Sequence, residues 1–516
     1  MAGTITVDGA SLTVEDVVRV AREGCRVELS KESTEKIERS RSVLESMAKE
    51  GRVIYGVTTG FGALSTTRIT LDQAAKLQAN LLRSHACAVG EALPTDIVRA
   101  ILLLRLNTMA KGHSGVRLAV ARLIQRFLND RIHPVIPSKG SVGASGDLAP
   151  LSHMALALIG EGTVEFQGEI RPSSEVLREI GVPSLSVTMK EGLALNNGTQ
   201  LSSAMAALAL HDAEQLLKTA DIAAAESLEA LRGLTEPFDP RIHKVRPFKG
   251  QMDAAENIRS MISQSKLVRE KVIDAYEPVQ DSYSIRCIPQ IMGAPREAVA
   301  FVRKLIETEI NSATDNPLVF PDGPDVLSGG NFHGQPVGLA MDLLSIALSI
   351  VGNVSERRVF RMLDASLSNG LPAFLVGSKE SNGLNSGLMA AQYTAAALVS
   401  ENKILSHPAT VDSIPTSANM EDFVSMSATA GLKVRTILQN TQRILAIELI
   451  CATQGLDFRD PTQCGRGTRI AYTTIRKKIP MITEDRAISG DIETVANMIA
   501  DGTLLKAVES EIQPLR

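Results

Sequence analysis

The chain has 516 residues, of which 44% are hydrophobic and 22% charged, a balance typical of soluble globular proteins. Its formal net charge of −4 argues against a surface that binds nucleic acid or another polyanion. Aromatic residues make up only 3% and tryptophan is absent, so the core must be built from aliphatic side chains.

The cysteines and the N-terminus indicate the compartment. The cysteines are scattered without a Cys-x-x-Cys pair, which favours reduced thiols over a disulfide framework or a metal site. The first residues lack the basic and apolar regions of a signal peptide. Apolar runs such as 100–104 meet charges too soon to span a bilayer. These features predict a cytoplasmic protein with no metal and no membrane partner. The cysteines are Cys25, Cys87, Cys287, Cys451 and Cys464.

The first 200 residues predict a smaller region of mixed secondary structure. A short strand is expected at 4–8 and an amphipathic helix at 13–24, with Thr13 as its N-cap. Residues 53–62 are β-branched and glycine-rich, which predicts a loop. Further helices are expected at 31–49, 71–83, 95–111 and 114–129, and strand-like segments at 163–172.

Residues 201–516 have a different character, with long runs rich in Ala, Leu and Ile and almost free of proline. Their apolar residues recur at spacings of three and four, the period of a helix. Several runs exceed the usual helix length, so they predict a mainly α protein with a long-helix bundle. Small residues on these helices favour close packing of helices, within one subunit or between subunits. The runs are 200–233, 338–365, 388–405 and 420–455.

The segment 140–152 has glycines at positions 140, 143 and 146, which predicts an unusual backbone path before a helix at 151–161. It is not a nucleophile elbow, because Asp147 stands where that motif needs glycine. Its glycine spacing does not match a dinucleotide fingerprint. On composition alone, a glycine-rich loop without chemistry is the simplest interpretation.

A different chemistry fits the tripeptide at the centre of this segment. If the backbone nitrogen of Gly146 attacks the carbonyl carbon of Ala144, a five-membered ring closes. Loss of two waters then turns Ser145 into an exocyclic methylene. Only glycine offers an unhindered amide nitrogen, and only serine can lose water in this way. The product is an electrophile that no ordinary side chain supplies.

The run Val142-Gly143-Ala144-Ser145-Gly146-Asp147-Leu148-Ala149-Pro150-Leu151-Ser152-His153 closely resembles the signature of the aromatic amino-acid ammonia-lyases. That family includes histidine, phenylalanine and tyrosine lyases and the related 2,3-aminomutases. The resemblance extends from about residue 5 to 510 through six separate motifs. It implies that the tripeptide self-cyclises to 4-methylideneimidazol-5-one (MIO), with no diffusible cofactor. It also implies the helical bundle of the ammonia-lyase/fumarase-like superfamily, assembled as a homotetramer with active sites shared between subunits.

The resemblance also implies roles for individual residues. Tyr55, which could be a packed turn tyrosine, would be the base that removes the β-proton of the substrate. Asn197, in an Asn-Gly turn, would hold the substrate and the cyclised loop. Its neighbour Asn196 departs from the family, which usually has an apolar residue there. Phe332, otherwise a core residue, would lie against the cyclised tripeptide.

A second motif would bind the carboxylate of an amino acid. The guanidinium of Arg286 is a planar fork that suits a carboxylate, although an isolated arginine more often forms a surface salt bridge. The resemblance places Arg286 on the substrate carboxylate and Tyr283 beside the electrophile. Gln280 would help to orient the complex.

Other residues would recognise the substrate ring. Ser84 and His85 resemble the histidine lyases, and Met389 would also contribute to substrate choice. Glu421 stands where histidine lyases have glutamate, and a carboxylate suits a ring with N–H donors. The ordinary alternative for Glu421 is a capping carboxylate near a helix start. Met420, Phe423 and the run 368–372 depart from the histidine type.

The resemblance therefore implies a carbon–nitrogen lyase that eliminates ammonia from an aromatic L-amino acid, closest to the histidine lyases. Its preferred reaction would convert L-histidine to urocanate. A tyrosine or phenylalanine lyase or a 2,3-aminomutase on the same scaffold is the alternative. A catalytically silent helical scaffold would be favoured if Ala144-Ser145-Gly146 stayed uncyclised.

Overall fold

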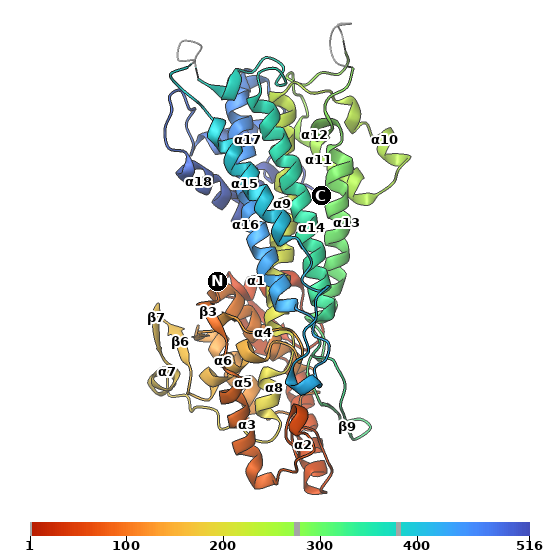
Figure 1. Cartoon of the computed structure of the whole chain (residues 1–516), viewed down its shortest axis with the longest axis vertical. Helices are drawn as coiled ribbons and strands as arrows, with labels where there is room; N and C mark the ends of the chain where they lie inside the picture. Colours follow the sequence, from red (N-terminus) through yellow and green to blue (C-terminus); the bar gives the residue numbers. More distant parts are fainter. Residues whose placement is uncertain (1–2, 273–278, 378–382) are drawn as a thin grey trace. The chain divides into compact units, whose positions relative to one another are not determined.

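The computed structural model describes residues 3–272, 279–377 and 383–516, and in this part of the chain it is mainly helical (Figure 1). The prediction of a mainly α protein is confirmed. The chain forms two compact units that interleave along the sequence. The first unit comprises Met1–His211, Arg303–Asp342 and Pro408–Leu432, and the second comprises Asp212–Val302, Leu343–His407 and Lys433–Arg516.

The first unit contains short strands and medium-length helices. Helix α1 begins directly after its N-cap Thr13, whose side chain accepts a hydrogen bond from the backbone N–H of Asp16 in a capping box, as the sequence predicted. Strands β1 and β2 pair in parallel, and β4, β6 and β7 form a three-stranded antiparallel sheet. The strands are β1 (Thr4–Val7), β2 (Arg26–Leu29), β3 (Val89–Ala92), β4 (His133–Pro134), β5 (Pro137–Lys139), β6 (Thr163–Phe166), β7 (Glu169–Pro172), β8 (Leu318–Phe320) and β9 (Asp325–Leu327).

The helices α1 to α6 of the first unit follow the predicted segments, although α5 begins four residues later and α6 three residues earlier than expected, and α7 and α8 were not predicted. These helices are α1 (Val14–Ala21), α2 (Lys31–Lys49), α3 (Leu71–His85), α4 (Thr95–Ala110), α5 (Leu118–Asn129), α6 (Leu148–Leu158), α7 (Ser173–Glu179) and α8 (Glu191–Asn196).

Long helices dominate the rest of the chain, and the division between the units falls inside four of them. These four are α9 (Gln200–Ala230), α13 (Ile288–Glu309), α14 (Gln335–Leu363) and α16 (Ser427–Asp457). Shorter helices complete the second unit: α10 (Pro240–Lys244), α11 (Lys249–Met261), α12 (Tyr283–Arg286), α15 (Met389–Leu405), α17 (Arg466–Arg476), α18 (Ser489–Ala500) and α19 (Thr503–Glu509).

Helix α14 is long and apolar enough, by length and composition, to cross a bilayer, with a mean hydropathy of 1.8 over its most apolar window. It is the only such helix among the described residues. However, 67% of that window is buried inside the structure, as in the core helix of a soluble protein.

A buried ion pair joins α9, α14 and α16 in the second unit. Glu448 accepts hydrogen bonds from Arg358 Nε at 2.5 Å and Nη2 at 2.8 Å, and both side chains are fully buried. Ser227 Oγ and Ser355 Oγ also donate to Glu448, at 2.7 Å and 2.6 Å. The carboxylate is therefore fully satisfied inside an otherwise aliphatic bundle.

We expect Arg358→Met to lower the free energy of unfolding by about 3–5 kcal/mol, because it leaves the charge of Glu448 buried and unpaired. The double variant Arg358→Met with Glu448→Leu should recover most of this loss, since neither charge remains. The measurement is the urea midpoint of the three proteins. A double variant no more stable than Arg358→Met would contradict this account.

Candidate active site

The loop before α6 is held in a conformation that only glycine tolerates at two positions. Gly143 and Gly146 have φ of +68° and +75°, in the left-handed region. A Cβ on Gly146 would lie 2.1 Å from the carbonyl oxygen of Gly198, and one on Gly143 would lie 2.1 Å from Ser425 Oγ. The backbone N–H of Asp147 donates to the same Gly198 oxygen at 2.7 Å. The tripeptide is thus pressed against the Asn197–Gly198 turn.

Asp147 fixes this loop from inside the protein. Its Oδ1 accepts hydrogen bonds from Ser141 Oγ at 2.7 Å and Ser202 Oγ at 3.0 Å. Its Oδ2 accepts from the backbone N–H of Ser202 at 2.9 Å. Complete burial raises the pKa of Asp147, and these hydrogen bonds oppose the rise. The loop is therefore tied to the first turn of α9 on its buried side.

The polar groups of Ser145 meet two of the predicted site residues. Ser145 Oγ donates to Glu421 Oε1 at 2.7 Å, and the Ser145 carbonyl oxygen accepts from Asn197 Nδ2 at 3.2 Å. Thr416 Oγ1 donates to the second carboxylate oxygen of Glu421 at 2.8 Å. The Oδ1 atom of Asn197 is buried without a partner among the described residues. A buried amide oxygen of this kind is available to a donor on a ligand.

The position of Glu421 differs from the sequence expectation. Residues 420–426 were expected in a helix, but α16 begins only at Ser427. Glu421 instead pairs with Thr416 in an isolated antiparallel bridge. It therefore does not cap a helix, and its carboxylate lies beside the tripeptide.

A cavity of about 300 Å³ opens at this point of the first unit. Its lining includes Ser84, His85, Ala144, Ser145, Gly146 and Glu421. Ser84 Oγ and His85 Nδ1 are 2.9 Å apart. Burial lowers the pKa of His85, and the charge of Glu421 opposes this, so the imidazole is neutral near pH 7. The cavity thus combines a neutral imidazole, a carboxylate and the tripeptide.

Cys87 also lines this cavity, although it was not among the site residues predicted from the sequence. Its position two residues after His85 could have indicated this, because α3 ends at His85 and Cys87, just beyond that end, lines the same cavity.

Tyr55 and Phe332 belong to the same unit but do not line this cavity. The Tyr55 hydroxyl accepts a hydrogen bond from the backbone N–H of Gly62 at 2.9 Å. The Tyr55 ring packs edge-on against Phe61, with 6.4 Å between the ring centroids. Phe332 is half-buried, two residues before Gly334, whose N–H donates to the Gly143 carbonyl oxygen at 3.4 Å.

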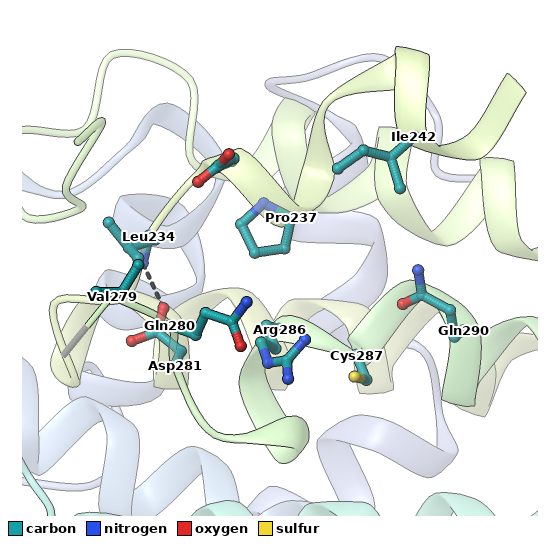
Figure 2. Close-up of a pocket in the computed structure, with 10 residues that line it drawn as sticks. Leu234, Pro237, Ile242, Val279, Gln280, Asp281, Arg286, Cys287 and Gln290 are labelled. Carbon is teal, nitrogen blue, oxygen red and sulfur yellow. Dashed lines mark hydrogen bonds between the residues drawn. The ribbon is translucent and has the colours of Figure 1, made fainter. Parts of the chain in front are cut away.

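The remaining candidates lie in the second unit. Figure 2 shows Gln280 and Arg286 beside a cavity of about 330 Å³, together with Asp281, Cys287 and Gln290. The Arg286 guanidinium lies over the Tyr283 ring, with its Cζ atom 4.5 Å from the ring centroid. Met389, half-buried, is the first residue of α15.

Arg286 is not the surface salt bridge that an isolated arginine would favour. It forms no ion pair within the described ranges, and its Nε is buried there without a partner. The carboxylate of its neighbour Asp281 instead accepts the backbone N–H of Leu234 at 2.6 Å. The Arg286 guanidinium is therefore available to an anionic ligand.

Comparisons with known proteins agree with the resemblance of the loop. Residues 12–477 match the family described as aromatic amino acid lyase. A histidine ammonia-lyase from Caldanaerobacter subterraneus is 50% identical over 507 residues, which cover 98% of each chain.

Solved structures give the same result. The tyrosine aminomutase from Streptomyces globisporus is 39% identical, with a TM-score of 0.95 over 99% of this chain and 100% of that one. The histidine ammonia-lyase from Trypanosoma cruzi is 42% identical, with a TM-score of 0.91 over 99% of this chain and 96% of that one. With a family match over most of its length and relatives that cover nearly all of it, the chain belongs to the aromatic amino acid lyase family.

Proposed function

We propose that this lyase eliminates ammonia from L-histidine to give urocanate. The observation that carries the proposal is the cavity in which His85 and Glu421 lie with Ser145, because it offers polar partners for an imidazole ring. The relative named histidine ammonia-lyase, half identical over nearly the whole chain, supports the same substrate.

The residues around the tripeptide fit the MIO group that the family implies. Gly146 must be glycine because Gly198 leaves no room for a Cβ, and glycine is also the residue whose nitrogen can close the ring. Asn197 and Asp147 would hold the group through the contacts described above. When formed, MIO supplies an electrophilic carbon that activates the substrate amine as a leaving group.

The other residues would bind the substrate and move its proton. Arg286 would hold the carboxylate, and Gln280 and Tyr283 would orient the complex. Tyr55 would take the β-proton, and Phe332 and Met389 would pack around the substrate and the tripeptide. We further infer a cytoplasmic homotetramer with active sites shared between subunits, acting on a small amino acid and not on nucleic acid or membranes.

A 2,3-aminomutase, or a lyase for tyrosine or phenylalanine, is the second candidate. The likeness to the Streptomyces globisporus tyrosine aminomutase favours it. Two residues that depart from the histidine type also favour it. Phe423 stacks on His333 with 6.2 Å between the ring centroids, and Met420 is exposed. Incubation with L-tyrosine, L-phenylalanine and L-histidine distinguishes the candidates, because a mutase forms a β-amino acid and each lyase product has its own absorbance.

We expect kcat/KM to be much higher for L-histidine than for L-phenylalanine. Glu421→Gln should lower the ratio of these two kcat/KM values by about tenfold. The carboxylate suits N–H donors of the ring, whereas it would be desolvated without a partner beside a phenyl group. The measurement is kcat/KM for L-histidine, L-phenylalanine and L-tyrosine by product absorbance. Glu493→Gln is the control, because Glu493 pairs with Arg443 on the surface. A wild-type preference for phenylalanine or tyrosine would show that Phe423 and Met420 are the better guide to the substrate.

A further inference from the structure

Arg105 is a fully buried arginine in α4 that holds the turn behind the tripeptide. Its Nη1 donates to the carbonyl oxygen of Ala194 at 2.9 Å, and its Nη2 donates to that of Asn197 at 2.9 Å. Both carbonyls belong to the C-terminal end of α8, where a helix leaves its last carbonyls without internal partners. One guanidinium therefore fixes the end of α8 and the backbone of Asn197 together.

The turn after α8 is enclosed on both sides. Gly198 has φ of +145°, and a Cβ there would lie 2.6 Å from Arg105 Nη2 and 2.4 Å from the Thr314 carbonyl oxygen. On the other side, the Gly198 carbonyl oxygen is the atom that leaves no room for a Cβ on Gly146. Gly198 is thus packed directly between Arg105 on one side and Gly146 on the other.

A second set of contacts fixes the guanidinium itself. Arg105 Nη2 also donates to Gln200 Oε1, and Gln200 Nε2 donates to Thr108 Oγ1 at 3.0 Å and Thr314 Oγ1 at 2.7 Å. Burial lowers the pKa of Arg105 to about 10, and the charges of Asp315 and Asp147 limit the fall. The side chain is therefore a cation at neutral pH, with its fork geometry held by neutral acceptors.

The start of α8 is fixed as firmly as its end. Lys190, fully buried at the N-cap, pairs with Asp315 at 2.8 Å, and Gln78 Oε1 accepts the Leu193 N–H at 2.9 Å. Movement of Asn197 therefore requires that the Arg105 fork release its carbonyl.

We propose that Arg105 is a positioning residue that sets the Asn197–Gly198 turn against the tripeptide. In this position the Asn197 amide donates to the Ser145 carbonyl oxygen, and the Gly198 carbonyl oxygen lies against Gly146, whose nitrogen would close the ring. Arg105 does not line the substrate cavity, so its effect passes through the turn. The inference rests on the proposed function, because it concerns formation and use of the same electrophile.

Arg105→Lys is the test, because lysine keeps the charge and loses the fork that spans two carbonyls. We expect a smaller fraction of protein that has lost two waters, measured by intact mass, or a kcat lowered by about tenfold or more with KM nearly unchanged. The control is Arg358→Lys, which alters the other large, fully buried arginine, in the second unit. It should lower stability while it leaves water loss and kcat unchanged.

The outcomes separate positioning from general support of the fold. Wild-type water loss and kcat in Arg105→Lys, or equal losses in both lysine variants, would overturn the inference. If Arg105→Lys does not fold, Gln200→Leu decides, since it keeps Arg105 and removes the acceptor that fixes the fork, together with the two hydrogen bonds that Gln200 donates to Thr108 and Thr314. A lower kcat at unchanged KM there supports positioning, and wild-type values overturn it. A wild-type protein that has lost no water would overturn the proposed cofactor and this inference with it, before any variant is made.

Discussion

Ser145→Ala is expected to fold, to keep both waters, and to lose lyase activity by at least about 1000-fold, or about 4 kcal/mol of transition-state stabilisation. Alanine has no hydroxyl to eliminate, so the exocyclic methylene cannot form. The fold should survive because the substitution removes one hydrogen bond, to Glu421, whose carboxylate keeps its bond from Thr416. Intact mass and the rate of product absorbance measure the two effects.

The control for this variant is Ser138→Ala, in β5 just before the loop. It removes a half-buried serine hydroxyl seven residues before Ser145 and leaves the tripeptide unaltered. It should lose two waters and remain active. Full activity in Ser145→Ala would contradict an electrophile made from this tripeptide, and the family's chemistry would then need another source in this chain.

Local signals in the sequence predicted much of the fold. Thr13 was expected as an N-cap, and its side chain accepts a hydrogen bond from the first turn of its helix. Helical periodicity located α9, α14 and α15 to within a few residues, because their runs of apolar residues continue with helical spacing and without an interrupting proline. The start of α16 was wrong by seven residues, since the residues before Ser427 take up a bridge and turns around Glu421 instead of continuing the helix.

The site itself depends on contacts that sequence order does not contain. Glu421 meets Ser145 across 276 residues, because the segment 408–432 returns to the first unit. Without the family resemblance, no local pattern would have paired them. Arg105 was missed for a related reason: within the predicted helix at 95–111 it appears only as a charge that ends an apolar run. Its role follows only from carbonyls about 90 residues away, which the fold brings to it.

Arg286→Ala is expected to lower kcat/KM for the amino-acid substrate. The expected loss of binding free energy in the transition state is about 2–5 kcal/mol, the usual effect of losing a charge-assisted partner of a carboxylate. The guanidinium has the position for this role: it lines a cavity with Gln280, stacks on Tyr283 and forms no ion pair within the described residues. Arg286→Lys should recover only part of the loss, because an ammonium cannot make two parallel hydrogen bonds to a carboxylate.

The matched control is Arg246→Ala, which removes another arginine stacked on an aromatic ring, Phe248, at 5.0 Å in the same unit. If stacking and surface charge alone were responsible, both alanine variants would lose activity equally. If Arg286 binds the carboxylate, only its variant should also lose the discrimination between L-histidine and histamine, which lacks that group. Unchanged kcat/KM in Arg286→Ala would exclude Arg286 from the site and would require another cation for the carboxylate.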